Sequence, residues 1–255
     1  MPEGPEVTFM AHELNERYKG CVLEKIKIVS GRYIRHGIPK ELEYFMKKKL
    51  PLKIEGFYNK GKFLYMKLED NHYIGIVLAM TGHILFAKEK HTHYHFITNC
   101  GTFYIEDIRN FASIHYYHEK ELENKLKTIG PDLLNERVSD KTFMTQLQKK
   151  PNQMIADVLL DQHLISGVGN YLRADSLYDS KISPFVYVKD MKPNDFKRLK
   201  KSLKKIMKKA VKSHIQHKYM KSYQFLVYGR KKTKKGEEVK RKKMDNGRSI
   251  YYVSF

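Results

Sequence analysis

The first residues of the chain could supply a reactive amine. Removal of the initiator Met would leave Pro2 with a free secondary amine. A model α-amino group has a pKa near 8, so roughly 10% of it is neutral at pH 7, against well under 0.1% of a lysine. A neutral amine attacks an aldehyde-like carbon to form a Schiff base. Pro2 is therefore a candidate nucleophile, and the adjacent Glu3 is a candidate general acid or base. The alternative is that both residues merely open a helix predicted over Pro5–Tyr18.

A second segment whose residues could serve a chemical function is LLDQHLISGVGNYLRAD, residues 159–175. An apolar helix is expected to end at Gly167 and Gly169, with Asn170 at the N-cap of the next helix. Glycines let a phosphate approach the backbone, and a helix N-terminus offers unpaired N–H groups and a positive dipole end. A tight helix connection would look similar, but the charge of the chain favours phosphate binding.

That charge is the main clue to a partner. Lys and Arg total 49 against 28 Asp and Glu, a formal net charge of +21. A polyanion is the simplest partner, and its binding would weaken with salt. A membrane surface is the rival, but no apolar run approaches 18 residues. The N-terminus lacks a signal-peptide pattern, and two cysteines are too few for a disulfide framework or a Cys-based zinc site. We expect a soluble, intracellular protein in a reducing compartment, with access to DNA in nucleus or cytoplasm.

The elements that must position these residues change in type along the chain, which predicts an α+β protein. Short alternating segments separated by Gly and Asn turns predict strands in the first 115 residues or so, and so a β-sandwich or barrel. The predicted strands are 22–29, 52–57, 63–68, 73–78, 94–98 and 102–105. Predicted helices follow near 140–149, 152–163, 171–180 and 194–216. Residues 197–212 are amphipathic and rich in lysine, which indicates a solvated face over a packed stripe rather than a direct DNA contact.

The tail returns to β character, with QFLVYGR and RSIYYVSF flanking a basic loop, and predicts a β-hairpin. With it, the chain resembles the formamidopyrimidine-DNA glycosylase / endonuclease VIII family over nearly its whole length. MPEGPEV is similar to the N-terminus of that family, residues 159–175 to its helix–two-turn–helix, and QFLVYGR to the start of its C-terminal finger. The resemblance implies an N-terminal β-sandwich over 1–125 carrying the nucleophile, a helical DNA-binding domain over 126–222 and a finger over 223–255.

The resemblance also implies the catalytic residues. Pro2 would attack the sugar C1′, Glu3 would assist ring opening and later proton transfers, and Glu6 would support the site. Lys62 would hold phosphate near the lesion, although on its own it looks like a surface lysine in a β-turn. Arg248, in GRSIY, would bind phosphate as well.

Further residues are implied to bind DNA. Gly169, Asn170 and Arg173 belong to the helix–two-turn–helix. A base that is flipped out leaves a gap in the duplex. Met80, Arg109 and Phe111 match the residues that fill this gap, meet the opposite base and wedge the stack, whereas composition alone would place Met80 and Phe111 in the core.

The sequence departs from the family pattern in its finger. Residues 230–255 contain no cysteine, so we expect a zincless finger, as in vertebrate and large-DNA-virus members, held by packing of Phe225, Val227, Ile250 and Tyr252. His91, His93 and His95 alternate on a predicted strand without a visible fourth ligand, so we expect no metal there. We expect no cofactor.

Other departures concern the substrate. Members of the family that are specialised for 8-oxoguanine carry a long loop between the last long helix and the finger, whereas the corresponding interval here, about His217–Tyr223, is too short to wrap a purine. The resemblance therefore implies oxidised pyrimidines, hydantoins and formamidopyrimidines as substrates, with weak 8-oxoguanine activity. Asp175 replaces a common Glu, and Asn110 and Ala112 replace Arg and Gly. The expected protein is a monomeric bifunctional DNA glycosylase and AP lyase acting on damaged duplex DNA by β,δ-elimination. The alternative is a non-catalytic nucleic-acid-binding protein of the same fold.

Overall fold

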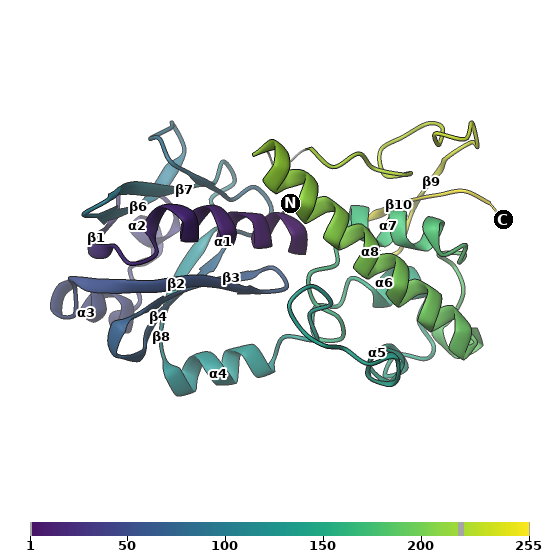
Figure 1. The fold of residues 1–255 in the computed structure, drawn as a ribbon, viewed down its shortest axis with the longest axis horizontal. Coiled ribbons are helices and arrows are strands. Elements are labelled where there is room, and N and C mark those ends of the chain that lie inside the picture. Colours follow the sequence, from purple (N-terminus) through teal and green to yellow (C-terminus); the bar gives the residue numbers. More distant parts are fainter. Residues whose placement is uncertain (1, 219–221, 255) are drawn as a thin grey trace. The chain divides into compact units, whose positions relative to one another are not determined.

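The computed structural model describes residues 2–218 and 222–254, which form two compact units. Unit 1 comprises Pro2 and Val7–Lys127, and unit 2 comprises Glu3–Glu6 and the chain from Thr128 onward. The first helix, α1 (Gly4–Tyr18), therefore begins in unit 2 and continues in unit 1 (Figure 1). The finger residues belong to unit 2 together with the helices, so a separate finger domain beginning at residue 223 stays a prediction.

Unit 1 is an antiparallel β-sandwich, as the sequence predicts. Its strand order is β5-β7-β6-β1-β2-β3-β4-β8, and β1 meets β2 through a short pairing of Val22 with Lys53 and Leu23 with Leu52. The strands are β1 (Val22–Ile28), β2 (Leu52–Lys60), β3 (Phe63–Leu68), β4 (His72–Val77), β5 (His83–Leu85), β6 (Thr92–Thr98), β7 (Gly101–Glu106) and β8 (Ser113–His118). The alternation that predicts β3 buries Leu64, Met66 and Leu68 in the core.

Several elements of unit 1 were not predicted. The strands β5 and β8 are short or rich in His and Tyr, so neither shows an apolar alternation. The missed helices are α2 (Arg32–His36), α3 (Lys40–Lys48) and the 3-10 turn η1 (Glu69–Asn71). The charged segment after residue 118 forms α4 (Glu119–Lys127). In α3 only Leu42 and Phe45 are buried, and two apolar residues are too few to reveal a helix in the sequence.

Cys21 and Cys100 form a disulfide within unit 1, with their Cα atoms 6.0 Å apart. They meet because Tyr18, at the end of α1, packs on Phe103 of β7 with ring centroids 5.1 Å apart. One disulfide is not a framework, so the expectation of no disulfide framework stands, but this pairing removes the basis for expecting a reducing compartment.

Unit 2 is a helical domain closed by a two-stranded hairpin. Its elements are α5 (Asp140–Leu147), α6 (Ile155–Val158), α7 (Asn170–Asp179), the 3-10 turn η2 (Val188–Asp190), α8 (Pro193–His217), β9 (Lys240–Lys243) and β10 (Ser249–Tyr252). Residues 159–169 form the turns between α6 and α7, so the helix predicted over 152–163 is much shorter than expected. The apolar stripe of α8 packs into one core with α7 and the hairpin residue Ile250.

The segment QFLVYGR is not a strand, which corrects the prediction. Its apolar residues pack into the core as expected: Val227 is wholly buried and Phe225 packs against the core. In β10, Ile250 is also wholly buried and Tyr252 packs against the same core. The backbone N–H groups of QFLVYGR find a side chain instead of a partner strand. Asp175 of α7 accepts hydrogen bonds from the N–H groups of residues 226, 227 and 228 at 2.8, 2.9 and 3.1 Å. A buried carboxylate thus accepts the hydrogen bonds that the carbonyl groups of a neighbouring strand would otherwise accept. The hairpin forms further along the chain, between β9 and β10.

Candidate active site

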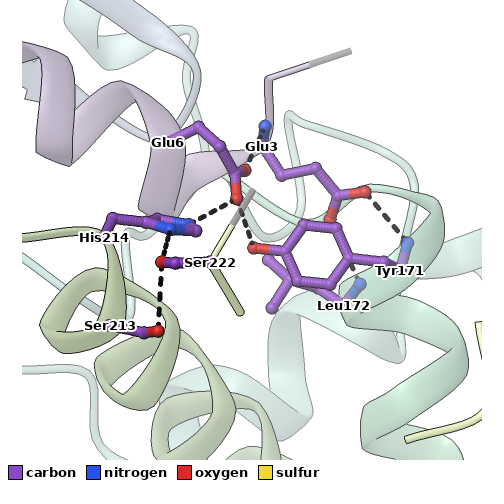
Figure 2. A network of polar contacts seen from close by, with 7 residues as sticks. All are labelled: Glu3, Glu6, Tyr171, Leu172, Ser213, His214 and Ser222. Carbon is purple, nitrogen blue, oxygen red and sulfur yellow. Dashed lines mark hydrogen bonds and ion pairs between the residues drawn. The ribbon is translucent and has the colours of Figure 1, made fainter. Parts of the chain in front are cut away.

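The carboxylate of Glu3 lies at the N-terminus of α7. Its Oε2 accepts hydrogen bonds from the N–H groups of Gly169 (2.8 Å) and Leu172 (3.2 Å), and its Oε1 accepts one from Tyr171 (2.9 Å). Figure 2 shows this carboxylate facing the start of the helix. The first N–H groups of a helix have no partner within it, and the helix dipole is positive there. Both effects stabilise a negative charge on Glu3, which is buried.

This arrangement corrects the predicted phosphate site. Gly169 is the N-cap of α7 and Asn170 is its first residue, whereas we expected Asn170 at the N-cap. The backbone donors that we assigned to a phosphate are used by Glu3. Gly169 is required because a Cβ there would lie 2.3 Å from the Glu3 carboxyl carbon. The carboxylate belongs to a residue 166 positions away, so no local pattern in the sequence reveals that it caps this helix.

The glycine turn also anchors the backbone after Glu3. The Gly4 N–H donates to the Gly167 carbonyl oxygen at 2.8 Å. Gln162 braces this turn, because its Oε1 accepts from the Gly167 N–H at 3.0 Å and its Nε2 donates to the Val168 carbonyl at 2.8 Å. The segment that directly follows Pro2 is therefore held by both its side chain and its backbone.

Glu6 gathers donors from three parts of unit 2. Its Oε2 accepts from the Glu3 N–H at 2.8 Å, and its Oε1 lies 3.0 Å from the Tyr171 hydroxyl and 2.8 Å from His214 Nε2 (Figure 2). Burial and the negative charges of Glu6 and Glu3 raise the pKa of Tyr171 well above its ordinary value, so its phenol stays a donor. Neither Tyr171 nor His214 was singled out from the sequence.

Arg173, which we assigned to DNA binding, is wholly buried. Its Nη2 donates to the Ser249 carbonyl at 2.8 Å and to Asn170 Oδ1 at 3.4 Å, and its Nη1 donates to the Ala156 carbonyl at 3.3 Å. Burial lowers its pKa to about 10, so the guanidinium stays charged at neutral pH. Because its Nη1 and Nη2 donate inside the protein and the side chain is buried, Arg173 fixes β10 and Asn170 and does not present its charge at the surface.

Arg248 is the exposed cation of this region. It lies in the turn between β9 and β10, where its N–H donates to Asn246 Oδ1 at 2.9 Å. Its positive charge contributes to the lowered pKa of Arg173. Unit 2 thus brings together Glu3, Glu6, Asn170 and Arg173 around α7, with Arg248 near enough to affect Arg173.

In unit 1, Lys62 lies in the tight turn between β2 and β3, after Gly61 with φ +55°.

Separately, unit 1 brings Met80, Arg109 and Phe111 together. Arg109 Nη1 lies 3.2 Å from the Met80 sulfur, and Arg109 Cζ lies 5.1 Å from the centre of the Phe111 ring. Met80 is 41% exposed and Phe111 is 50% exposed, so neither is the core residue that composition alone would suggest.

Asp107, which the sequence analysis missed, organises both of these loops. Its carboxylate accepts from the Thr81 hydroxyl, next to Met80, and from the N–H groups of Arg109 (3.2 Å), Phe111 (2.5 Å) and Ala112 (2.6 Å). Burial raises the pKa of Asp107, but these hydrogen bonds together outweigh it, so the pKa lies below its ordinary value. A single buried anion therefore connects the loop of Met80 to the loop of Arg109 and Phe111.

Within residues 2–218 and 222–254, no group of three His, Cys, Asp or Glu side chains is placed to hold a metal ion. His93 instead contacts Ser30 Oγ at 2.7 Å and the Asp107 carbonyl at 2.8 Å. No helix in the described part of the chain is long and apolar enough to cross a membrane.

Comparison with known proteins now decides the family. Residues 1–114 match the formamidopyrimidine-DNA glycosylase N-terminal domain, and residues 129–220 match the formamidopyrimidine-DNA glycosylase H2TH domain. The chain is 30% identical over 207 residues to formamidopyrimidine-DNA glycosylase of Bacillus cereus, covering 78% of this chain and 74% of that protein. The chain belongs to the formamidopyrimidine-DNA glycosylase family. The Ureaplasma parvum enzyme is also 30% identical, over 79% of this chain and 75% of that protein.

Solved structures of this family share the fold over the whole chain. Lactococcus lactis formamidopyrimidine-DNA glycosylase, non-covalently bound to DNA with an AP site, is 26% identical with a TM-score of 0.84, covering 98% of this chain and 97% of that one. The Lactococcus lactis protein with DNA containing Fapy-dG is 25% identical with a TM-score of 0.85, over 98% and 97% of the two chains. These matches confirm the family and the α+β fold, and the zincless subtype stays a prediction.

Proposed function

We propose that the protein is a base-excision-repair DNA glycosylase and AP lyase that uses the Pro2 amine as its nucleophile. The arrangement of Glu3 carries this proposal. Its carboxylate is held by three backbone N–H groups of unit 2, and its own N–H by Glu6, so the residue next to Pro2 has a fixed position. A fixed carboxylate beside an amine can move a proton to and from it.

The reaction follows from these groups. The neutral Pro2 nitrogen bonds to C1′ as the bond from C1′ to the damaged base breaks, and the base leaves with the bonding electron pair and takes up a proton from solvent water. The nitrogen passes its proton to Glu3, whose charged form is stabilised by α7. The C1′–O4′ bond then breaks, the nitrogen lone pair completes an iminium ion, and Glu3 returns the proton to O4′.

Strand cleavage follows from the iminium ion, which withdraws electrons from the sugar. Loss of a C2′ proton expels the 3′ phosphate, and loss of the C4′ proton expels the 5′ phosphate. Water then hydrolyses the iminium ion and frees Pro2. Of the acid and base roles expected for Glu3, its hydrogen bonds favour the base role first.

Groups that are partly or fully exposed on each unit support DNA binding. Lys62, Asn170 and Arg248 are proposed to bind phosphates, while Arg173 positions Asn170 through the hydrogen bond described above. Met80, Arg109 and Phe111 are proposed to enter the duplex where the damaged base leaves, because Met80 and Phe111 are exposed apolar side chains that cluster around Arg109. The net charge of +21 is suited to a duplex.

Oxidised pyrimidines, hydantoins and formamidopyrimidines are the proposed substrates. This proposal depends on the short connection from His217, the end of α8, to Tyr223. Part of that connection, residues 219–221, lies outside the described residues.

The decisive experiment is borohydride trapping on DNA with an abasic site. We expect a covalent adduct whose peptide, identified by mass spectrometry, begins at Pro2. Retaining a tag on the N-terminus should abolish the adduct, whereas the same tag at the C-terminus should not. An adduct on a lysine, or normal strand cleavage with the amine blocked, would overturn the proposal. Salt-sensitive DNA binding without any adduct would instead favour the non-catalytic alternative.

A further inference from the structure

His214 is a buried titratable residue that the proposed reaction does not use. It lies in the last turn of α8 and is wholly buried. The buried stripe of this helix includes Phe196, Leu199, Leu203 and Ala210, and His214 takes the next position, four residues after Ala210. An apolar side chain would suit that position, and a buried imidazole is costly unless its nitrogens are hydrogen-bonded.

The hydrogen bonds of His214 have a definite order. Ser213 Oγ donates to Ser222 Oγ at 3.0 Å, and Ser222 Oγ lies 3.1 Å from His214 Nδ1. Ser222 can then donate to Nδ1, which leaves the ring proton on Nε2. Nε2 lies 2.8 Å from Glu6 Oε1, so it donates to that carboxylate (Figure 2).

Glu6, which His214 holds in place, also binds the N-terminal segment. It has three donors, namely His214, the Tyr171 hydroxyl at 3.0 Å and the Glu3 N–H at 2.8 Å. The Glu3 N–H belongs to the Pro2–Glu3 peptide bond. Because a peptide unit is planar, fixing this N–H also fixes the plane that contains the Pro2 carbonyl and Cα.

The peptide is therefore held from two helices. The carboxylate of Glu3 is bound by α7, and its N–H is bound by Glu6, which His214 of α8 orients. The hydrogen bonds that begin at His214 thus end at the peptide that follows the nucleophile. Small errors in the position of a nucleophile reduce its rate much more than they reduce substrate binding.

We propose that His214 is a positioning residue for the Pro2 nucleophile, acting through Glu6 on the Pro2–Glu3 peptide. The proposal rests on the proposed function, since it assumes that Pro2 attacks the sugar. It assigns His214 no contact with DNA and no proton transfer to substrate.

The test compares His214→Leu, His214→Gln and the control His217→Gln, an exposed residue one turn further along the same helix. Single-turnover trapping on saturating abasic-site DNA gives the rate, and a non-cleavable abasic analogue gives Kd. We expect His214→Leu to slow trapping about tenfold or more, with Kd changed less than about threefold. Gln places an amide donor near Nε2, so His214→Gln should recover most of the rate, and His217→Gln should match the wild type.

Other outcomes would overturn the proposal. These are a wild-type rate in His214→Leu, or equal losses of rate and Kd in both His214 variants, which would indicate a purely structural role. No adduct from the wild-type protein would overturn the proposed function, and this inference with it. NMR of the ring nitrogens tests the geometry without the reaction: Nε2 should carry a proton in the wild type, and an unprotonated Nε2 would refute the hydrogen-bond order.

Discussion

Replacing Gly169 by alanine should break the contact between Glu3 and α7. Gly169 has φ −131° and ψ −156°, which alanine adopts without strain. The added Cβ would lie 2.3 Å from Glu3 Cδ and 2.4 Å from Oε1. Restoring an ordinary contact requires a shift of about 1 Å. The N–H bonds to Glu3 are now 2.8 to 3.2 Å long, so such a shift would break one or two of them.

The size of the effect follows from those bonds. A hydrogen bond to a charged group contributes about 1.5–3 kcal/mol, so Gly169→Ala should lower the free energy of unfolding of unit 2 by about 2–4 kcal/mol. Urea unfolding followed by far-UV circular dichroism reports this, because the long helices α7 and α8 lie in unit 2. Trapping on abasic-site DNA should slow as well, since Glu3 moves.

A double-mutant cycle isolates the cause. Glu3→Ala removes the side chain that the new methyl group would strike, so adding Gly169→Ala to Glu3→Ala should cost little further stability. The coupling between the two changes should be about 2 kcal/mol or more. If Gly169→Ala costs the same in both backgrounds to within about 0.5 kcal/mol, the close approach of Glu3 to Gly169 is not what the glycine provides.

Three further predictions concern other parts of the chain. The folded pKa of Asp107 is lowered, so this residue stabilises unit 1 above the unfolded value near 3.9 and loses that contribution as pH falls through the folded pKa. Asp107→Asn should therefore destabilise unit 1 at pH 7 by about 1–3 kcal/mol and flatten its acid unfolding profile, and an unchanged profile would contradict this account. Arg248→Ala should reduce the slope of log K against log salt by about 1 across DNA sequences, and an unchanged slope would argue against a phosphate contact. The Cys21–Cys100 bond closes a loop with a separation of 79 residues, so replacing both by serine should lower the stability of unit 1 by up to about 4 kcal/mol, as measured by thermal unfolding without reductant. Equal stability of the two proteins would contradict this contribution.

The sequence determined what depends on local pattern and on matched motifs. Alternation in segments such as 63–68 specified strands, because one face of a strand packs inward. The stripe along α8 specified a long helix to within a residue or so at each end. The N-terminal motif and the glycine segment pointed to the family, which the comparisons confirm.

The tertiary structure decided which distant groups complete one another. Glu3 caps α7, Asp175 replaces a strand partner for residues 226–228, and Asp107 connects two loops. Each case is a buried carboxylate that satisfies backbone N–H groups elsewhere in the chain. Every residue except proline has the same backbone N–H group, so the residue type does not indicate which N–H groups need an acceptor from elsewhere. Sequence pattern alone therefore cannot show where that acceptor comes from.

The same reason explains why the backbone donors at the start of α7 and the charge of Arg173 were wrongly expected to face DNA. The sequence suggested that the N-terminus of α7 was open to phosphate and that Arg173 was available to DNA. In the folded protein the Glu3 carboxylate accepts the hydrogen bonds of those backbone donors, and the Arg173 guanidinium donates to the Ser249 carbonyl of β10. The residue types near α7 could thus be recognised in the sequence. Whether their hydrogen-bond donors are free to bind DNA depends on the long-range contacts that the fold brings to them.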